Sequence, residues 1–198
     1  SKAHTINIKN VTLDNADAAT REVIQNPTIM SFWNCTYNIE NVIFTASNTN
    51  KDATVMATYW TGNESGSAKA VYNVKNCVFN CDGRRPIQFY GNTTATFDNC
   101  TFHNPYRYVA AVHGGGNVVT WRNITVTNND VAGKSYYNIV EVGTDVNDYE
   151  GGSVPDKIIV EGTNNYPETV NGKPVYPYAY AENAVKKDQV IEGASFSE

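Results

Sequence analysis

Residues 76–79 read Asn-Cys-Val-Phe, and residues 99–102 read Asn-Cys-Thr-Phe. Three more stretches, beginning at Asn10, Asn41 and Asn123, also place a small or β-branched residue, one variable residue and a large apolar residue after an Asn. Each stretch follows a β-rich segment, and the successive Asn residues are 31, 35, 23 and 24 positions apart. A β-rich repeat of roughly 20–30 residues is typical of a solenoid whose coils stack on one another. We therefore predict an all-β fold, a single-stranded parallel β-helix, which is right-handed because crossover connections have that hand.

The repeat predicts which residues stack. An Asn at a sharp turn can adopt the left-handed backbone region and hydrogen-bond neighbouring groups, so equivalent Asn side chains are expected to form a ladder. Cys77 and Cys100 both follow a repeat Asn and are expected to lie one above the other in the core. The four cysteines fit either buried free thiols or a disulfide, which could involve Cys81, and Cys35 is the fourth member of the set.

A column of glycines marks the strand ends, and the repeat stops before the end of the chain. Gly62, Gly91, Gly114 and Gly143 each end a strand-like run, where Gly permits a positive φ. We predict coils over residues 1–162 and, in the same domain, an irregular tail over residues 163–198 that caps the last coil. Residues 182–192 are expected to form a short helix or to cover that coil.

The composition excludes several classes of protein. A net charge of −5, from 15 basic and 20 acidic residues and without a long basic run, argues against nucleic acid as a partner. No run approaches the roughly 20 apolar residues of a membrane-spanning helix. The sequence opens at Ser1 without a signal peptide, so we expect a mature product or a piece of a longer chain. Abundant Asn, Thr, Tyr and Gly indicate a secreted or cell-surface protein, and we expect a bacterial source.

Strand alternation predicts an exterior strip of polar and aromatic residues on one sheet, counted back from the glycine column. Flat rings stack on sugar faces and polar groups select hydroxyls, so such a strip suits carbohydrate recognition. The alternative is ordinary surface filling, because Tyr and Trp are common in strands. The predicted strip consists of Tyr90, Gln88, His113, Ala111 and, by a looser alignment, Trp60 and Glu141.

Residues 76–91 read NCVFNCDGRRPIQFYG, in which an Arg-x-Pro sequence, Arg84 to Pro86, begins eight residues after the repeat Asn. This spacing and the Gly at 91 resemble a segment of the family 1 pectate lyases. The rhythm of residues 97–126 and the Tyr-rich tail are similar to the same family, so the resemblance covers roughly residues 70–195.

The resemblance implies a role for Arg84 as the base that removes the C5 proton of a uronate, and the alternative is an exposed Arg on a turn next to Pro86. Arg85 is a further candidate for substrate binding. The resemblance also implies calcium, for which the sequence identifies no ligands. The family's second Arg would fall at Phe89, which cannot perform that role. Two functions follow: a pectate-lyase-like protein that binds or cleaves an acidic polysaccharide by β-elimination, or a non-catalytic adhesin or glycan-binding module. The sequence does not predict the oligomeric state.

Overall fold

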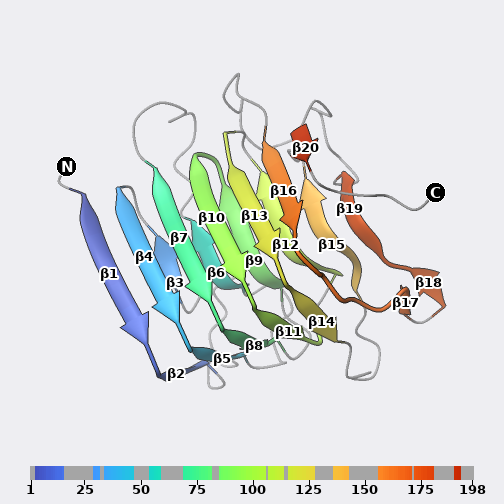
Figure 1. Cartoon of the computed structure of the whole chain (residues 1–198), viewed down its shortest axis with the longest axis horizontal. Coiled ribbons are helices and arrows are strands. Elements are labelled where there is room, and N and C mark those ends of the chain that lie inside the picture. The colour runs from blue at the N-terminus through green and yellow to red at the C-terminus, as the bar shows by residue number, and fades with distance from the viewer. Residues whose placement is uncertain are drawn as a thin grey trace, which may run out of the picture.

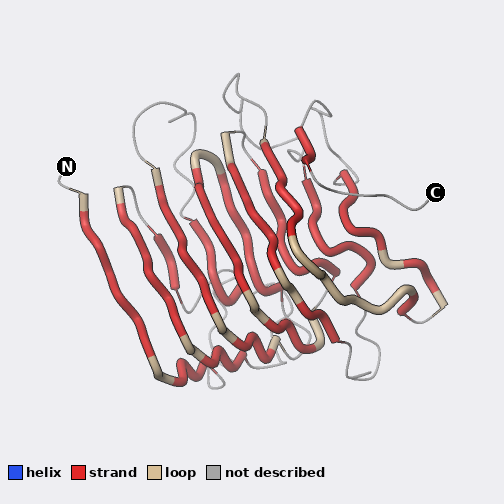
Figure 2. Tube along the Cα trace, viewed as in Figure 1, coloured by secondary structure: helices blue, strands red, loops and turns tan. Residues whose placement is uncertain are grey.

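Three parallel β-sheets run along the length of the molecule and enclose a single core (Figure 1). The structure is a computed structural model, and its strands are joined by turns, with no helix among the described residues (Figure 2). The fold is therefore a parallel β-helix, as the Asn repeat predicted. The residues described are 3–15, 29–31, 34–46, 54–58, 69–81, 85–105, 107–113, 116–127, 136–142, 156–170, 172–180 and 190–192.

The first five coils each contribute one strand to sheets A, B and C in turn. Sheet A contains β1 (His4–Lys9), β4 (Cys35–Glu40), β7 (Ala70–Lys75), β10 (Thr93–Asp98), β13 (Val118–Arg122), β16 (Lys157–Glu161) and β20 (Val190–Glu192). Sheet B contains β2 (Thr12–Asn15), β5 (Ile43–Ala46), β8 (Val78–Asn80), β11 (Thr101–His103) and β14 (Thr125–Thr127). Sheet C contains β3 (Ile29–Ser31), β6 (Thr54–Thr58), β9 (Arg85–Tyr90), β12 (Arg107–His113), β15 (Tyr136–Val142) and β19 (Tyr176–Tyr180). Sheets A and C form the front and back of the molecule in Figure 1, and sheet B closes its lower edge.

The repeat Asn makes the corner between sheets A and B. All five repeat Asn residues have φ between 53° and 57°, a left-handed conformation that Asn tolerates better than other residues with a side chain. Two steps of the predicted ladder are hydrogen-bonded: Asn41 donates to Asn10 at 3.1 Å, and Asn99 donates to Asn76 at 2.8 Å. Asn123 differs, since its Nδ2 donates to Oδ1 of Asp98 at 3.4 Å. The ladder fixes how each coil sits on the next.

Gly162 continues this corner after the fifth Asn. It follows Glu161, which pairs with Arg122 in the neighbouring strand, so Gly162 takes the position that Asn123 holds one coil earlier. Its φ is 66°, and a Cβ added there would collide with Oδ1 of Asn123. That oxygen accepts a hydrogen bond from the backbone N–H of Thr163 at 3.1 Å, so the amide has little freedom to move.

Aromatic side chains form columns in the core. Phe79 stacks between Phe44 and Phe102 with ring centroids 4.6 and 4.5 Å away, because these residues occupy the third position after successive repeat Asn residues. Tyr72 of sheet A stacks on Phe89 of sheet C at 5.4 Å. Stacked aromatic pairs contribute roughly 0.5–1.5 kcal/mol each beyond the burial of their area. These contacts hold sheets A and C at opposite sides of one core.

The cysteines are free thiols in the structure, the first of the two alternatives left by the sequence. Cys77 and Cys100 lie against each other on successive coils, and both are buried. The contact with Cys77 and burial raise the pKa of the Cys100 thiol, so this residue stays protonated and behaves as a small apolar core residue.

The tail is more regular than the sequence predicted. Instead of ending at residue 162, the coils continue, since β19 pairs in parallel with β15 and β20 pairs with β16. The Asn, Pro and Tyr residues of this segment gave it an irregular pattern. One of them, Pro177, lies in β19, the edge strand of sheet C, where a missing N–H can be tolerated. A short antiparallel pair, β17 (Thr169–Val170) and β18 (Lys173–Pro174), precedes β19. Residues 181–189, which hold most of the helix predicted at the chain end, lie outside the described residues.

Gly162→Ala tests the corner. Gly172 also has a positive φ, 73°, but no atom lies within 4 Å of an added Cβ, so Gly172→Ala measures the backbone cost alone. We expect Gly172→Ala to lower the free energy of unfolding by about 1–2 kcal/mol, and Gly162→Ala to lower it by a further 1–3 kcal/mol or so through crowding. Urea unfolding followed by circular dichroism checks this. Equal losses for the two variants would mean that the Asn123 amide does not constrain the corner.

Candidate functional site

The strand pairing of sheet C brings part of the predicted strip together. Tyr90, the last residue of β9, pairs with His113 of β12, and Gln88 pairs with Ala111. Ala111 also pairs with Glu141 of β15. Tyr90 and His113 are therefore neighbours on successive coils, as the glycine column predicted.

Other predicted residues are placed less fully. Arg85 is the first residue of β9, directly before Pro86. Side-chain positions are described for neither Arg85 nor Tyr90, His113 and Glu141. Arg84 and Trp60 lie outside the described residues. The roles assigned to all six residues stay predictions.

The prediction that this strip is exterior is wrong for Gln88 and Ala111. Gln88 is only 5% exposed and Ala111 is 0% exposed, although Ala111 is not part of the core cluster inside the solenoid. Gln88 Nε2 donates a hydrogen bond of 2.7 Å to the hydroxyl of Tyr108, which is also buried and also outside the core cluster. Strand alternation separates the two faces of a sheet but does not determine what covers the outer face. Gln88 is placed to orient Tyr108, and its role in substrate binding stays a prediction.

A buried polar column holds the turns that follow the strands of sheet C. Asn117 is fully buried, accepts the backbone N–H of Thr93 at 3.0 Å through Oδ1, and donates to Oδ1 of Asp156 at 2.7 Å through Nδ2. Asp156 also accepts the backbone N–H of Asn117 at 3.1 Å. Buried polar groups that are hydrogen-bonded in this way make a rigid turn. These hydrogen bonds therefore hold together the starts of three sheet A strands, β10, β13 and β16.

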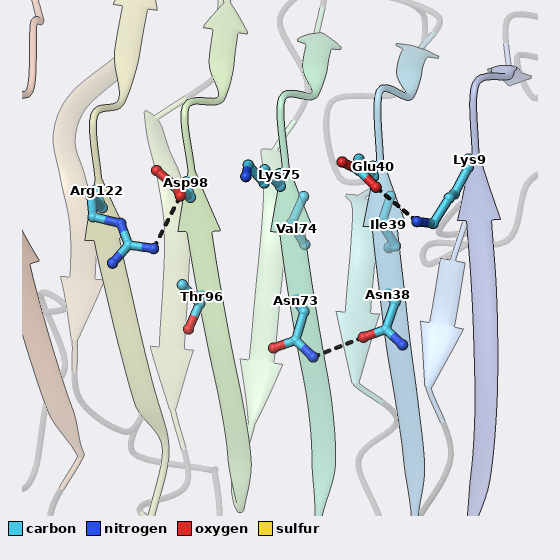
Figure 3. A pocket seen from close by; sticks show the side chains of 10 residues that line it. All are labelled: Lys9, Asn38, Ile39, Glu40, Asn73, Val74, Lys75, Thr96, Asp98 and Arg122. Carbon is cyan, nitrogen blue, oxygen red and sulfur yellow. Dashed lines mark hydrogen bonds and ion pairs between the residues drawn. The ribbon is translucent and has the colours of Figure 1, made fainter.

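The exposed face of sheet A carries a row of alternating charges that the sequence analysis missed. The last residue of each of six adjacent strands faces outward, and strand pairing aligns these residues in a line that we call the charge row. It consists of Lys9, Glu40, Lys75, Asp98, Arg122 and Glu161. Part of the row borders a groove of about 330 Å³ that crosses five strands (Figure 3).

Neighbouring members of the charge row form ion pairs across the strands. Lys9 Nζ lies 2.8 Å from Glu40, and Arg122 lies 3.0 Å from Asp98 and 3.5 Å from Glu161. The hydrogen bond from Arg122 lowers the pKa of the Asp98 carboxyl below its ordinary value, and the hydrogen bond from Lys9 does the same for Glu40. These carboxyl groups are therefore ionised at neutral pH. Lys75 lies between Glu40 and Asp98 in the row (Figure 3).

A second row of amides and hydroxyls, which we call the amide row, runs beside the charge row. It consists of Asn7, Asn38, Asn73, Thr96 and Thr120. Asn38 donates to Asn7 and Asn73 donates to Asn38, both at 2.9 Å, so three amides form a ladder on the outer face of sheet A. Thr96 and Thr120 continue the row on β10 and β13. The groove is thus lined by groups that both donate and accept hydrogen bonds, without an aromatic ring among its lining residues.

Both rows had a signal in the sequence. Each charged residue directly precedes a repeat Asn or Gly162, and each member of the amide row lies three positions before that corner. The repeat sets the register, so the residues that directly precede each repeat Asn and Gly162 lie in one line across the sheet. Their order in the sequence already shows that positive and negative charges alternate. The glycine column pointed to sheet C instead, so the predicted site contained no member of the charge row.

Neither a metal site nor a membrane span is found in the described residues. They contain no group of three or more His, Cys, Asp or Glu side chains that could hold a metal ion. Among them there is also no helix with the length and apolar character needed to cross a membrane.

Comparisons with known proteins do not assign this chain to a family. No protein-family model, no curated protein and no solved structure matches this chain. The function has to be argued from the chain's own residues.

The charge row predicts a measurable pKa. We expect an NMR titration to place the pKa of Asp98 below the value of about 3.9 for an unperturbed Asp, and Arg122→Gln to raise it. Because the folded pKa is lowered, Asp98 stabilises the fold above its unfolded pKa and loses that contribution as the pH falls through the folded value. Lys9→Gln is the matched control, since it should raise the pKa of Glu40 and leave Asp98 unchanged. An Asp98 pKa unaffected by Arg122→Gln would contradict the pairing.

Proposed function

We propose that this protein is an extracellular polysaccharide-binding β-helix whose ligand is an acidic polymer that lies across the strand ends of sheet C. The observation that carries the proposal is the pairing of Tyr90 with His113 on successive coils. An aromatic ring beside an imidazole suits the stacking and hydrogen bonding by which proteins recognise sugars. Arg85 is the first residue of β9, the strand that ends at Tyr90, and Arg84 precedes it in the sequence, so both basic residues are close to Tyr90 along the chain.

The fold supports a polymeric ligand better than a compact one. Strands in a parallel sheet lie about 4.8 Å apart, so a residue type repeated on each coil meets a chain of similar units at regular intervals. The buried Gln88–Tyr108 hydrogen bond and the polar column around Asn117 stiffen the surroundings of the strand ends. A rigid surface loses less conformational entropy when it binds a long, flexible polymer.

Cleavage is the further possibility that the resemblance to pectate lyases raises. In that reaction Arg84 removes the proton at C5 of a uronate, the electron pair forms the C4=C5 double bond, and the C4–O bond breaks as the leaving oxygen takes a proton. A guanidinium is normally protonated, so Arg84 acts as a base only where neighbouring groups favour its neutral form. Phe89, in place of the family's second Arg, favours the alternative of a glycan-binding module without catalysis.

A polygalacturonate assay separates these outcomes. We expect the protein to bind the polymer in a pull-down or calorimetric titration, and Tyr90→Ala to weaken binding by about tenfold through the loss of sugar stacking. Ile43→Ala is the control, because Ile43 is exposed on sheet B, away from sheet C. Absence of binding by the native protein to polygalacturonate and to other acidic polymers would overturn the proposal.

The same mixture reports cleavage. With calcium present, β-elimination produces an unsaturated sugar that absorbs in the ultraviolet. A rise in absorbance that Arg84→Ala abolishes identifies a lyase with Arg84 as its base. Retained binding without any rise at high protein concentration identifies a non-catalytic polysaccharide-binding protein, and a rise that survives Arg84→Ala excludes Arg84 as the base.

A further inference from the structure

When the order of the charge row is reversed, every position carries the opposite charge. From β1 to β16 its signs are plus, minus, plus, minus, plus and minus. A second copy of the row, turned end to end, places an opposite charge against every member. A two-fold symmetric interface requires this kind of self-complementarity, because one surface patch meets the same patch on the other subunit.

One member of the row lies between two carboxylates, whose pKa values its charge lowers, without a close ion pair to either of them. Lys9, Glu40, Asp98, Arg122 and Glu161 all form ion pairs within the chain. The Lys75 ammonium forms none within the part of the chain that the structure describes, although it is at the middle of the row (Figure 3).

We propose that the outer face of sheet A is a homodimer interface in which two copies pack face to face with their solenoid axes antiparallel. The two-fold axis lies along the strand direction, between β7 and β10. In this arrangement Lys75 of one protomer lies opposite Asp98 of the partner subunit, and Glu40 lies opposite Arg122 of the partner subunit. The Lys75 ammonium thereby gains a carboxylate at close range across the interface.

The charges select this register over its neighbours. A slip by one strand in either direction places like charges opposite each other along the whole row, which is strongly unfavourable at close range. The other two-fold axis within the plane of the sheet would set the charge row against the uncharged side chains of Thr36, Val71 and Thr94. The charges would then lose water without gaining partners.

The amide row also matches itself under the proposed axis. Asn73 lies opposite Thr96 of the partner subunit, and Asn38 lies opposite Thr120 of the partner subunit, so amides meet hydroxyl groups. Six strands about 4.8 Å apart and five residues long at about 3.3 Å per residue give a face of roughly 500 Å² per protomer. The total of about 1,000 Å² is near the lower limit for a specific interface, so the dimer is expected to be reversible.

The dimer leaves the proposed polymer site accessible. Sheet C lies at the opposite side of the solenoid from sheet A (Figure 1), so the two sheet C faces of the dimer point away from each other. Two sites on one particle bind a long polymer more tightly than one site, or link two polymers. This consequence rests on the proposed function, whereas the dimer itself does not.

Charge reversal at the centre of the row tests the dimer. Sedimentation velocity at about 0.15 M salt, which screens the repulsion between chains of net charge −5, is expected to show a concentration-dependent species of twice the 21.8 kDa chain mass. Lys75→Glu alone and Asp98→Lys alone should each weaken association by at least tenfold or so, because each sets like charges opposite one another. An equimolar mixture of the two variants should dimerise again, since each then meets an opposite charge on its partner.

Controls separate the interface from folding. Glu168→Lys makes the same change of net charge as Asp98→Lys at an exposed residue away from sheet A, and it should leave association unchanged. Thr96→Arg adds bulk at the centre of the face without touching the charge row and should also prevent dimerisation. Circular dichroism checks that each variant is folded.

Three results would overturn the proposal. A native protein that stays monomeric at the highest attainable concentration has no such interface. Failure of the mixed variants to associate while both remain folded shows that charge complementarity does not form the dimer. Variants of sheet A that lose polysaccharide binding, with the oligomeric state unchanged, identify this face as a glycan-binding surface instead.

Discussion

The structure depends on the left-handed turn at each repeat Asn. A positive φ is costly for most residues, and Asn adopts it readily while its side chain remains available for hydrogen bonding. Repeating the turn at Asn76 and Asn99 stacks two amides, aligns two strands of sheet A and superimposes two strands of sheet B. Gly162 also has a positive φ at this corner, and because it lacks a side chain it does not collide with the Asn123 amide of the preceding coil.

Because the corner sets the register, it also determines the composition of each surface. A residue one position before the corner lies in the charge row, and a residue three positions after it stacks in the aromatic column of the core. Cross-strand ion pairs such as Arg122–Asp98 then reinforce a register that the backbone has already imposed. Ion pairs this exposed are worth little individually, so their arrangement carries more information about recognition than about stability.

For the polar and aromatic residues of sheet C, the sequence pattern predicts strand register but not burial. The glycine column correctly placed Tyr90 beside His113, since that relation follows from strand register alone. It did not predict that Gln88 is buried against Tyr108, because burial depends on which other parts of the chain cover the sheet. The tail differed for a similar reason: Pro177 disfavours a central strand, but only the finished sheet defines which strand is at its edge.

The sequence by itself determined the β-helix, the Asn corners, the stacking of Cys77 on Cys100 and the pairing of Tyr90 with His113. These features follow from a local conformational preference that recurs once in every coil, although the coils differ in length, so each coil carries the information needed to place it on the next. Only the tertiary structure decided which outer faces are exposed and that a groove borders the charges of sheet A. Exposure and surface complementarity are properties of several coils together, and a pattern within one coil does not contain them.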